Sequence, residues 1–255
     1  MSLSLRIAFF CGLTWLVLPF FAQTDPSAAL AQSEVTASPG SSGDQSSVGQ
    51  PSGAPAQKAD ALLLFRQARD LEAAGKIADA KALYTKSIAI CDGELAADPR
   101  RMDAYAVKCW SLFRLNRHEE VISTGTTALK VIFDARIAEA MGESYFFLGK
   151  NDLAIQSFTS YLESGQFGDR ISTAYFFLGE LYLRMHKWSH ADIAYTTAVK
   201  LEPSMARWWY RLGQVCENLG DWQRSVDAYT KALSLSPGMQ EATDGLTRVK
   251  AKLGT

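Results

Sequence analysis

His118, His186 and His190 are the residues of this chain best suited to bind a metal ion or to transfer a proton. His186 and His190 are four residues apart, the spacing at which two side chains on one helix can share a zinc ion. However, they straddle a predicted turn between two helices, and the glutamate of the H-E-x-x-H zinc motif is missing. We therefore predict no metal site and no cofactor.

Other patterns that carry catalysis are missing as well. The sequence contains no Walker A loop, no nucleophile elbow and no paired-carboxylate signature, so we predict that the chain is not an enzyme. Cys11 lies in an apolar N-terminal segment, and Cys91, Cys109 and Cys216 lack the C-x-x-C spacing of redox and metal sites. We interpret these three as small helical core residues and leave open a Cys91–Cys109 disulfide in an oxidising compartment.

The overall charge argues against a nucleic-acid partner. The 255 residues carry a formal net charge of -1, without the basic excess that a polyanion would attract. The eight prolines are unevenly placed, with five before residue 60 and only Pro99, Pro203 and Pro237 after it. Long stretches of the second part therefore contain no helix breaker.

Residues 1–31 are predicted to be a secretory signal peptide. Arg6 precedes an apolar run from Ile7 to Ala22, which is short for a membrane span. Small residues allow cleavage after Ala31 or after Ala22. We expect an exported protein in the periplasm or another extracytoplasmic space. An uncleaved signal that anchors the chain in the membrane is the alternative.

Residues 32–57 are predicted to be a disordered linker. Between Ser38 and Pro55, most residues are Ser, Gly or Pro, which cannot bury enough apolar surface to offset the loss of chain entropy on folding. Such a linker would keep the folded part at a distance from any N-terminal anchor.

The remaining part, 58–255, contains a repeat with a period of 34 residues. Nine positions of one unit return in the next. They pair Tyr175, Leu178, Gly179, His186, Trp188, Tyr195, Ala198, Leu201 and Pro203 with Trp209, Leu212, Gly213, Gly220, Trp222, Tyr229, Ala232, Leu235 and Pro237.

These positions resemble the tetratricopeptide repeat, a 34-residue unit with Leu-Gly at positions 7 and 8, small residues at 20 and 27, and Pro at 32. The units run about 61–94 with an extension to 101, then 102–134, 135–168, 172–205 and 206–239, followed by a cap helix over 240–255. The resemblance implies an all-α solenoid of antiparallel helix pairs. Gly75, Asn116, Gly149, His186 and Gly220 mark the turn inside each pair, where glycine and asparagine tolerate a positive φ. In the second unit Gly125 replaces the usual aromatic residue at position 24.

In this family the first helix of each pair lines a concave surface, and its residues there do not need to be apolar for folding. In this chain aromatic residues occupy many of those positions. They are Phe65, Trp110, Phe113, Phe146, Phe147, Phe176, Phe177 and Tyr210. We interpret them as a groove for an extended peptide or an amphipathic helix of a partner. The alternative is that the superhelix buries some of these rings. Trp208, next to the core position Trp209, either contacts a partner or covers the preceding unit.

Charged residues lie among the rings and could orient a partner. The arginines assigned to the groove are Arg114, Arg184, Arg207 and Arg211, with Arg66 and Arg69 near them and Glu139, Glu143 and Glu180 between them. Arg207 and Arg211 match part of the family's clamp for a C-terminal carboxylate. Glu139 and Glu143 would repel a carboxylate at the other part, so binding of that type is not expected.

Two functions follow as alternatives. The first is an exported scaffold of the bacterial-envelope kind that binds proteins or peptides through the aromatic groove. The second is a carrier or transport accessory protein that holds a small apolar ligand in the same place. Contact with a membrane is expected only if the signal remains as an anchor.

Overall fold

The computed structural model describes residues 60–165 and 170–254. The chain separates into residues 1–56 and 57–255, so the predicted signal peptide and linker lie outside the described residues. The described residues form eleven helices and no strand, which confirms the all-α prediction for this part of the chain. The helices are α1 (Ala61–Ala73), α2 (Ile77–Ala97), α3 (Met102–Arg114), α4 (His118–Leu129), α5 (Ala135–Phe147), α6 (Asn151–Glu163), α7 (Ile171–Arg184), α8 (Trp188–Leu201), α9 (Ala206–Leu219), α10 (Trp222–Leu235) and α11 (Gln240–Leu253).

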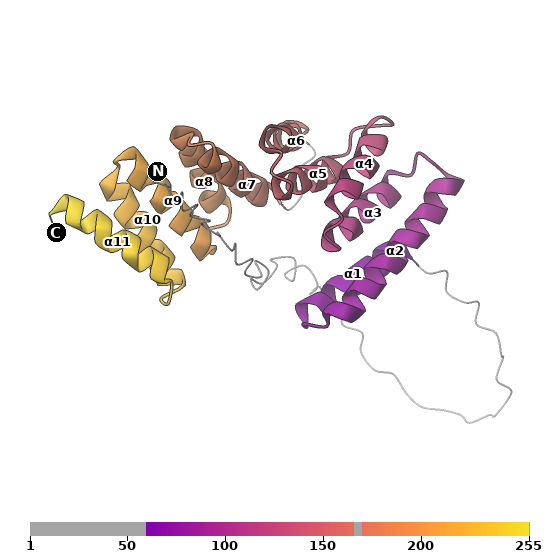
Figure 1. The fold of residues 1–255 in the computed structure, drawn as a ribbon, viewed down its shortest axis with the longest axis horizontal. Helices are drawn as coiled ribbons and strands as arrows, with labels where there is room; N and C mark the ends of the chain where they lie inside the picture. The colour runs from indigo at the N-terminus through magenta and orange to yellow at the C-terminus, as the bar shows by residue number, and fades with distance from the viewer. Residues whose placement is uncertain (1–59, 166–169, 255) are drawn as a thin grey trace, which may run out of the picture. The chain divides into compact units, whose positions relative to one another are not determined.

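The first ten helices form five antiparallel pairs, and α11 follows the last pair (Figure 1). Each helix packs against the next along the chain, and first helices of neighbouring pairs also meet, for example α3 with α5 and α9 with α11. Because each pair contacts mainly its neighbours, the core is a series of clusters between pairs.

A left-handed residue closes the turn inside every pair. The five φ angles are positive, at 76° for Gly75, 59° for Asn116, 71° for Gly149, 55° for His186 and 75° for Gly220. This confirms all five predicted turns. His186 adopts this left-handed conformation although it lacks the backbone freedom of glycine. We infer that packing of the helices on either side imposes the turn.

Close approach of the two helices in a pair depends on a small residue opposite a ring. Gly179 of α7 faces Tyr195 of α8, and Gly213 of α9 faces Tyr229 of α10. A Cβ atom at Gly213 would lie 2.7 Å from the Tyr229 ring, closer than nonbonded carbon atoms approach. Both tyrosines are fully buried. The repeated glycine is therefore required by packing rather than by backbone geometry.

The second pair reverses this arrangement. Cys109 stands where the other pairs have a glycine or alanine, and Gly125 replaces the ring. A Cβ atom at Gly125 would lie 2.4 Å from the Met141 sulfur and 3.1 Å from Ile137. Two side chains of the following helix thus fill the space that a ring occupies elsewhere, which explains how the weakest repeat keeps its packing.

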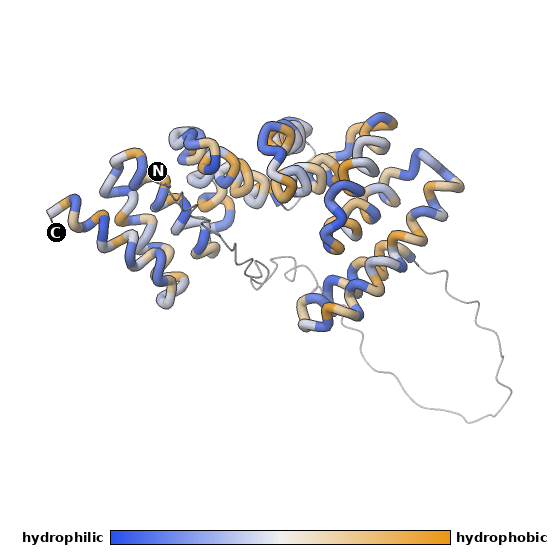
Figure 2. The backbone as a smooth tube through the Cα atoms, in the orientation of Figure 1, coloured by the Kyte–Doolittle hydropathy of each residue, from blue (hydrophilic) through white to orange (hydrophobic). Residues whose placement is uncertain are grey.

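Hydrophobic and hydrophilic residues are mixed along the helices (Figure 2), and α9, α10 and α11 are the most clearly amphipathic. None of the described helices is long and apolar enough to span a bilayer. Cys91, Cys109 and Cys216 are buried free thiols in this structure. Burial raises the pKa of Cys91 and Cys109 to about 12 and that of Cys216 to about 11, so these thiols are unreactive.

Candidate functional site

Six of the eight predicted groove rings form one continuous chain of aromatic contacts across α3, α5 and α7. Trp110 meets Phe113 with ring centroids 5.4 Å apart, and Phe113 meets Phe147 at 5.8 Å. The contacts continue through Phe146, Phe177 and Phe176 at 4.9–5.8 Å. These edge-to-face contacts are favourable in themselves and hold each ring in a fixed orientation.

Most of these rings are less exposed than the groove prediction requires. Phe113, Phe146, Phe176 and Phe177 are buried, and Trp110 is half-buried. Phe147, at the end of α5, is the exception, with 42% of its surface exposed. The expectation of an open ring-lined groove is therefore corrected. Neighbouring repeats bury most of the rings against one another, because successive first helices pack closely enough for their aromatic side chains to meet.

The two remaining predicted rings belong to their own repeats. Phe65 lies 5.7 Å from Tyr84, and Tyr210 lies 6.0 Å from Tyr229, so neither joins the chain of rings. Trp208 is buried and stacks on Phe176 at 5.2 Å, so of its two possible roles the structure assigns it that of covering the preceding repeat.

His118 is a member of the ring cluster that the sequence did not indicate. As the first residue of α4, it stacks on Phe147 with centroids 5.2 Å apart and lies edge-on to Phe113. Burial lowers its pKa, and the nearby Glu119 acts in the opposite direction. The imidazole that stacks on the exposed Phe147 ring is therefore uncharged at neutral pH.

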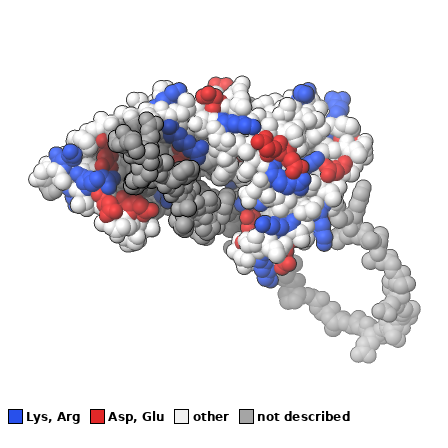
Figure 3. Space-filling view, viewed as in Figure 1, with Lys and Arg blue, Asp and Glu red and all other residues white. Residues whose placement is uncertain are grey.

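Ion pairs connect the first helices at every junction between repeats, and in each the carboxylate comes from the earlier repeat and the arginine from the later one. Blue and red side chains accordingly lie next to one another on the face in Figure 3. The pairs are Glu72–Arg114 at 3.7 Å, Asp103–Arg136 at 2.9 Å, Glu139–Arg170 and Glu143–Arg170 at 2.5 Å, Glu180–Arg211 at 2.7 Å and Glu217–Arg248 at 2.9 Å.

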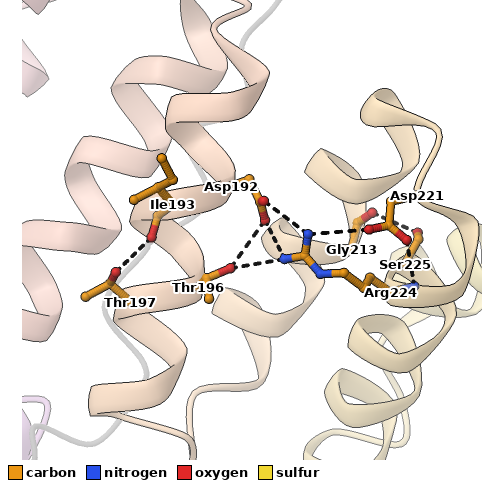
Figure 4. Close-up of polar contacts among 8 residues, drawn as sticks. All are labelled: Asp192, Ile193, Thr196, Thr197, Gly213, Asp221, Arg224 and Ser225. Carbon is orange, nitrogen blue, oxygen red and sulfur yellow. Dashed lines mark hydrogen bonds and ion pairs between the residues drawn. The ribbon is translucent and has the colours of Figure 1, made fainter.

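An ion pair between two second helices has the same order, with the carboxylate on the earlier repeat and the arginine on the later one. Asp192 of α8 pairs with Arg224 of α10 at 2.7 Å, as Figure 4 shows. Two of the predicted groove arginines, Arg114 and Arg211, are therefore structural connectors between repeats. Their sequence interpretation as partner-orienting groups did not anticipate these carboxylate partners.

The most buried carboxylates of these pairs are bound by Arg170, which immediately precedes α7 and whose own side chain is 36% exposed. Its guanidinium donates to one oxygen each of Glu139 and Glu143 and lies 5.1 Å from the Trp110 ring centroid. The two carboxylate side chains are only 6% and 5% exposed. One cation thus serves two buried carboxylates, so this site carries an excess of negative charge when both are ionised.

Protonation of this site should make the protein more stable at mildly acidic pH. Burial, together with Glu143, raises the pKa of Glu139 to about 7 although Arg170 opposes the shift. A raised carboxyl pKa means that the folded state holds the proton more tightly than the unfolded chain, so this stabilisation is complete below the unfolded pKa and is lost as pH rises through about 7.

We expect the urea midpoint of the wild type to fall between pH 6 and pH 8 by an amount equivalent to roughly 1–2 kcal/mol, and Glu139→Gln to lose most of that decrease. Urea titrations of the two proteins at both pH values, followed by tryptophan fluorescence, make the comparison. Equal decreases in both proteins would assign the pH dependence to other groups.

Arg184, another predicted groove arginine, forms no ion pair within the described residues. Its guanidinium carbon lies 3.7 Å from the Phe146 ring centroid, and it donates to the Phe146 carbonyl oxygen at 3.2 Å. Burial lowers its pKa despite the opposing charge of Glu180. Arg184 is therefore a cation stacked on Phe146, and the Phe146 ring in turn contacts the exposed Phe147 ring with centroids 5.4 Å apart. Arg207, at the start of α9, is half-buried.

The remaining histidines lie against separate aromatic rings. His186 is 5.2 Å from Trp188, and His190 is 5.1 Å from Tyr182. The described residues contain no cluster of three potential metal ligands.

A periodic signal for the ion pairs exists in the sequence. Glu139–Arg170, Glu180–Arg211 and Glu217–Arg248 are all separated by 31 residues. This is one helical turn less than the 34-residue repeat, so the arginine reaches back toward the carboxylate of the previous unit. A search for opposite charges at that spacing would have separated Arg211 from Arg184, although it would not have found the Glu72–Arg114 pair.

The comparisons with known proteins agree with this architecture. Residues 178–239 match a family model described as Tetratricopeptide repeat. The fold is similar to a crystal structure of MamA protein, with 18% identity over 69% of this chain and 92% of that one and a TM-score of 0.52. It is also similar to YrrB, described as a TPR protein with an unusual peptide-binding site, with 17% identity over 72% and 91% of the two chains and a TM-score of 0.52. None of the curated protein sequences matches the chain.

Fold and repeat pattern together define an α-solenoid of stacked helix pairs. The 34-residue units of this solenoid resemble the tetratricopeptide repeat, and the family model of that repeat matches residues 178–239.

Proposed function

We propose that this protein is an exported scaffold that binds a segment of a partner protein on its first-helix surface, in complexes of the bacterial envelope. The observation that carries the proposal is the exposed Phe147 ring, which contacts the Phe146 ring on which Arg184 is stacked. Among the large hydrophobic side chains exposed in the described residues, only Phe147 and Phe133 are aromatic. Exposed rings that are held rigidly are characteristic anchors of protein interfaces.

The surroundings of Phe147 favour a segment that carries both an apolar and an acidic side chain. The contacts with Phe113, His118 and Phe177 fix the ring, so little side-chain entropy is lost on binding. Arg184 forms no ion pair within the described residues, and a carboxylate of the partner would form a charge-assisted hydrogen bond with it.

Export is supported by the apolar run from Ile7 to Ala22 and is tested by fractionating cells that produce the full chain. The alternative, a small apolar ligand, is less well supported by the packing of the rings. Its expected lining rings fill the space with contacts to one another instead.

Replacing Phe147 by serine and Arg184 by glutamine should weaken partner binding by at least about tenfold while leaving the helical content unchanged. Affinity capture from envelope extracts, followed by titration of the captured partner in purified form, measures the loss. Ile193→Ser is the matched control, because Ile193 is an exposed apolar residue of α8, with 67% of its surface exposed. Unchanged affinity in the double variant, or an equal loss in the control, would refute the proposed surface.

A further inference from the structure

His118 is a titratable residue in direct contact with the exposed Phe147 ring. The two rings are stacked, with centroids 5.2 Å apart and planes 14° from parallel. Phe113 meets the same imidazole at a distance of 5.4 Å and an angle of 67°. The imidazole is therefore part of the packing that fixes the Phe147 side chain.

The fold does not require a histidine at this place. The five second helices begin at the same position of the repeat, and only the first residue of α4 can change its charge near neutral pH. The five first residues are Ile77, His118, Asn151, Trp188 and Trp222. A titratable ring thus occurs at the helix start that contacts the exposed Phe147 ring and at none of the other four.

The surroundings of His118 oppose a positive charge. Its Nδ1 atom is buried and has no hydrogen-bond partner in the described residues. Both ring nitrogens of an imidazolium carry a proton, so protonation leaves a buried N–H donor without an acceptor. His118 is also the first residue of α4, where the helix dipole is positive and disfavours a cation. Burial accordingly lowers the pKa of His118.

The neighbouring charges do not remove this penalty. Helix α4 packs against α3 and α5 (Figure 1). The other charged side chains of α4, and those at the adjoining ends of α3 and α5, each have an opposite charge beside them. These pairs are Arg117–Glu120, Lys150–Glu119, Arg114–Glu72 and Arg170–Glu143. Of these groups Glu119 raises the pKa of His118, and burial outweighs it.

We propose that protonation of His118 releases the Phe147 ring from its fixed orientation, so that acid weakens binding at this surface. The imidazolium turns toward water, because the preceding residues Asn116 and Arg117 are exposed. Phe147 then loses its stacking partner, and a bound protein must order the ring at a cost in entropy. His118 acts on a partner only through Phe147 and is therefore a positioning residue. The effect on the ring stands alone, whereas the effect on binding rests on the proposed function.

The direction of the pH dependence follows from the lowered pKa. The folded state favours the neutral imidazole, so the stack is complete above the ordinary histidine pKa of about 6.5. The stack is lost as pH falls through the lower pKa of the folded state. This range lies below that of Glu139, whose pKa is raised to about 7, so the two transitions are separable.

A fluorine probe in the ring itself tests the release. We place para-fluorophenylalanine at position 147 of the full chain and follow its fluorine NMR resonance from about pH 7.5 to about pH 4.5. In the wild type the resonance should move toward that of His118→Ala, which lacks the stacked ring at every pH. His118→Phe keeps an uncharged ring against Phe147, so its resonance should stay constant.

His190→Phe is the matched control, because His190 lies against Tyr182 at 5.1 Å and outside the ring cluster. This variant should keep the full response. The histidine signal that His118→Phe removes from a ring-labelled sample should titrate below about pH 6.5. The proposal is overturned by a constant wild-type resonance, by an equal movement in His118→Phe, or by a His118 signal that titrates at or above the ordinary value.

Binding is measured separately, by titrating the captured partner at both ends of the pH range. The wild type should bind several-fold more weakly at the acidic end, and His118→Phe should bind equally at both. Equal wild-type affinity despite a moving resonance would refute the effect on binding. Unchanged affinity in Phe147→Ser with Arg184→Gln refutes the proposed surface instead, while the fluorine result still decides whether His118 controls the ring.

Discussion

Replacing Arg170 by methionine is expected to lower the free energy of unfolding by roughly 2–4 kcal/mol. The substitution leaves Glu139 and Glu143 buried without their shared cation. Proton uptake by one carboxylate limits the loss, because a buried carboxyl in apolar surroundings becomes neutral rather than remaining charged. Urea titration at pH 7 measures the change.

Two variants separate this effect from simple loss of a side chain. Adding Glu139→Gln and Glu143→Gln to Arg170→Met should restore most of the stability, since no buried charge then remains. Arg117→Met is the matched control, because Arg117 and Glu120 form a pair whose side chains are 41% and 54% exposed. Exposed pairs contribute little, so the control should change stability by less than about 1 kcal/mol. An equal loss in Arg117→Met would contradict the special role of the Arg170 site.

Replacing Gly213 by alanine should also be strongly destabilising, by roughly 1–3 kcal/mol, although alanine is the better helix former. The new methyl group would lie 2.7 Å from the Tyr229 ring. The ring cannot move aside freely, because Tyr229 is fully buried and its hydroxyl donates to Glu217 at 2.7 Å. Two helices would therefore have to separate.

Gly93→Ala is the control for this substitution. Gly93 is also inside a helix, α2, but no atom lies within 4 Å of the place its Cβ would take. There, alanine should stabilise the protein by up to about 1 kcal/mol through its higher helix propensity. Thermal unfolding of both variants measures the two changes in stability, which are expected to have opposite signs. Stabilisation by Gly213→Ala would show that the glycine–ring contact is not what sets the distance between α9 and α10.

The fold could be predicted from the sequence because its determinants repeat. The glycine opposite each tyrosine, as at Gly179 and Gly213, returns at the same spacing, and so do the left-handed turn residues. Even His186 could be placed by its position in the repeat. Gly125 was harder, since the residues that fill its space, Met141 and Ile137, come from the next repeat.

The candidate site could be predicted only in part. Repeat positions identify which residues lie on first helices, but exposure depends on how far one repeat is rotated on the next. Phe146 and Phe147 are neighbours in sequence, yet one is buried and the other exposed. Likewise, position in the repeat alone did not distinguish Arg211, which pairs with Glu180, from Arg184, which lies over a ring; the 31-residue spacing of opposite charges does. That difference arises from packing between repeats.

The central claim, that partners bind at the exposed ring of the first-helix surface, is tested most directly by photo-crosslinking in living cells. A photoreactive phenylalanine derivative at Phe147 should crosslink a partner protein, and Arg184→Gln should reduce the yield several-fold. The same group at Ile193 should give no such product. Crosslinks of equal yield at both positions, or none at Phe147 while the partner is still captured, would contradict the account.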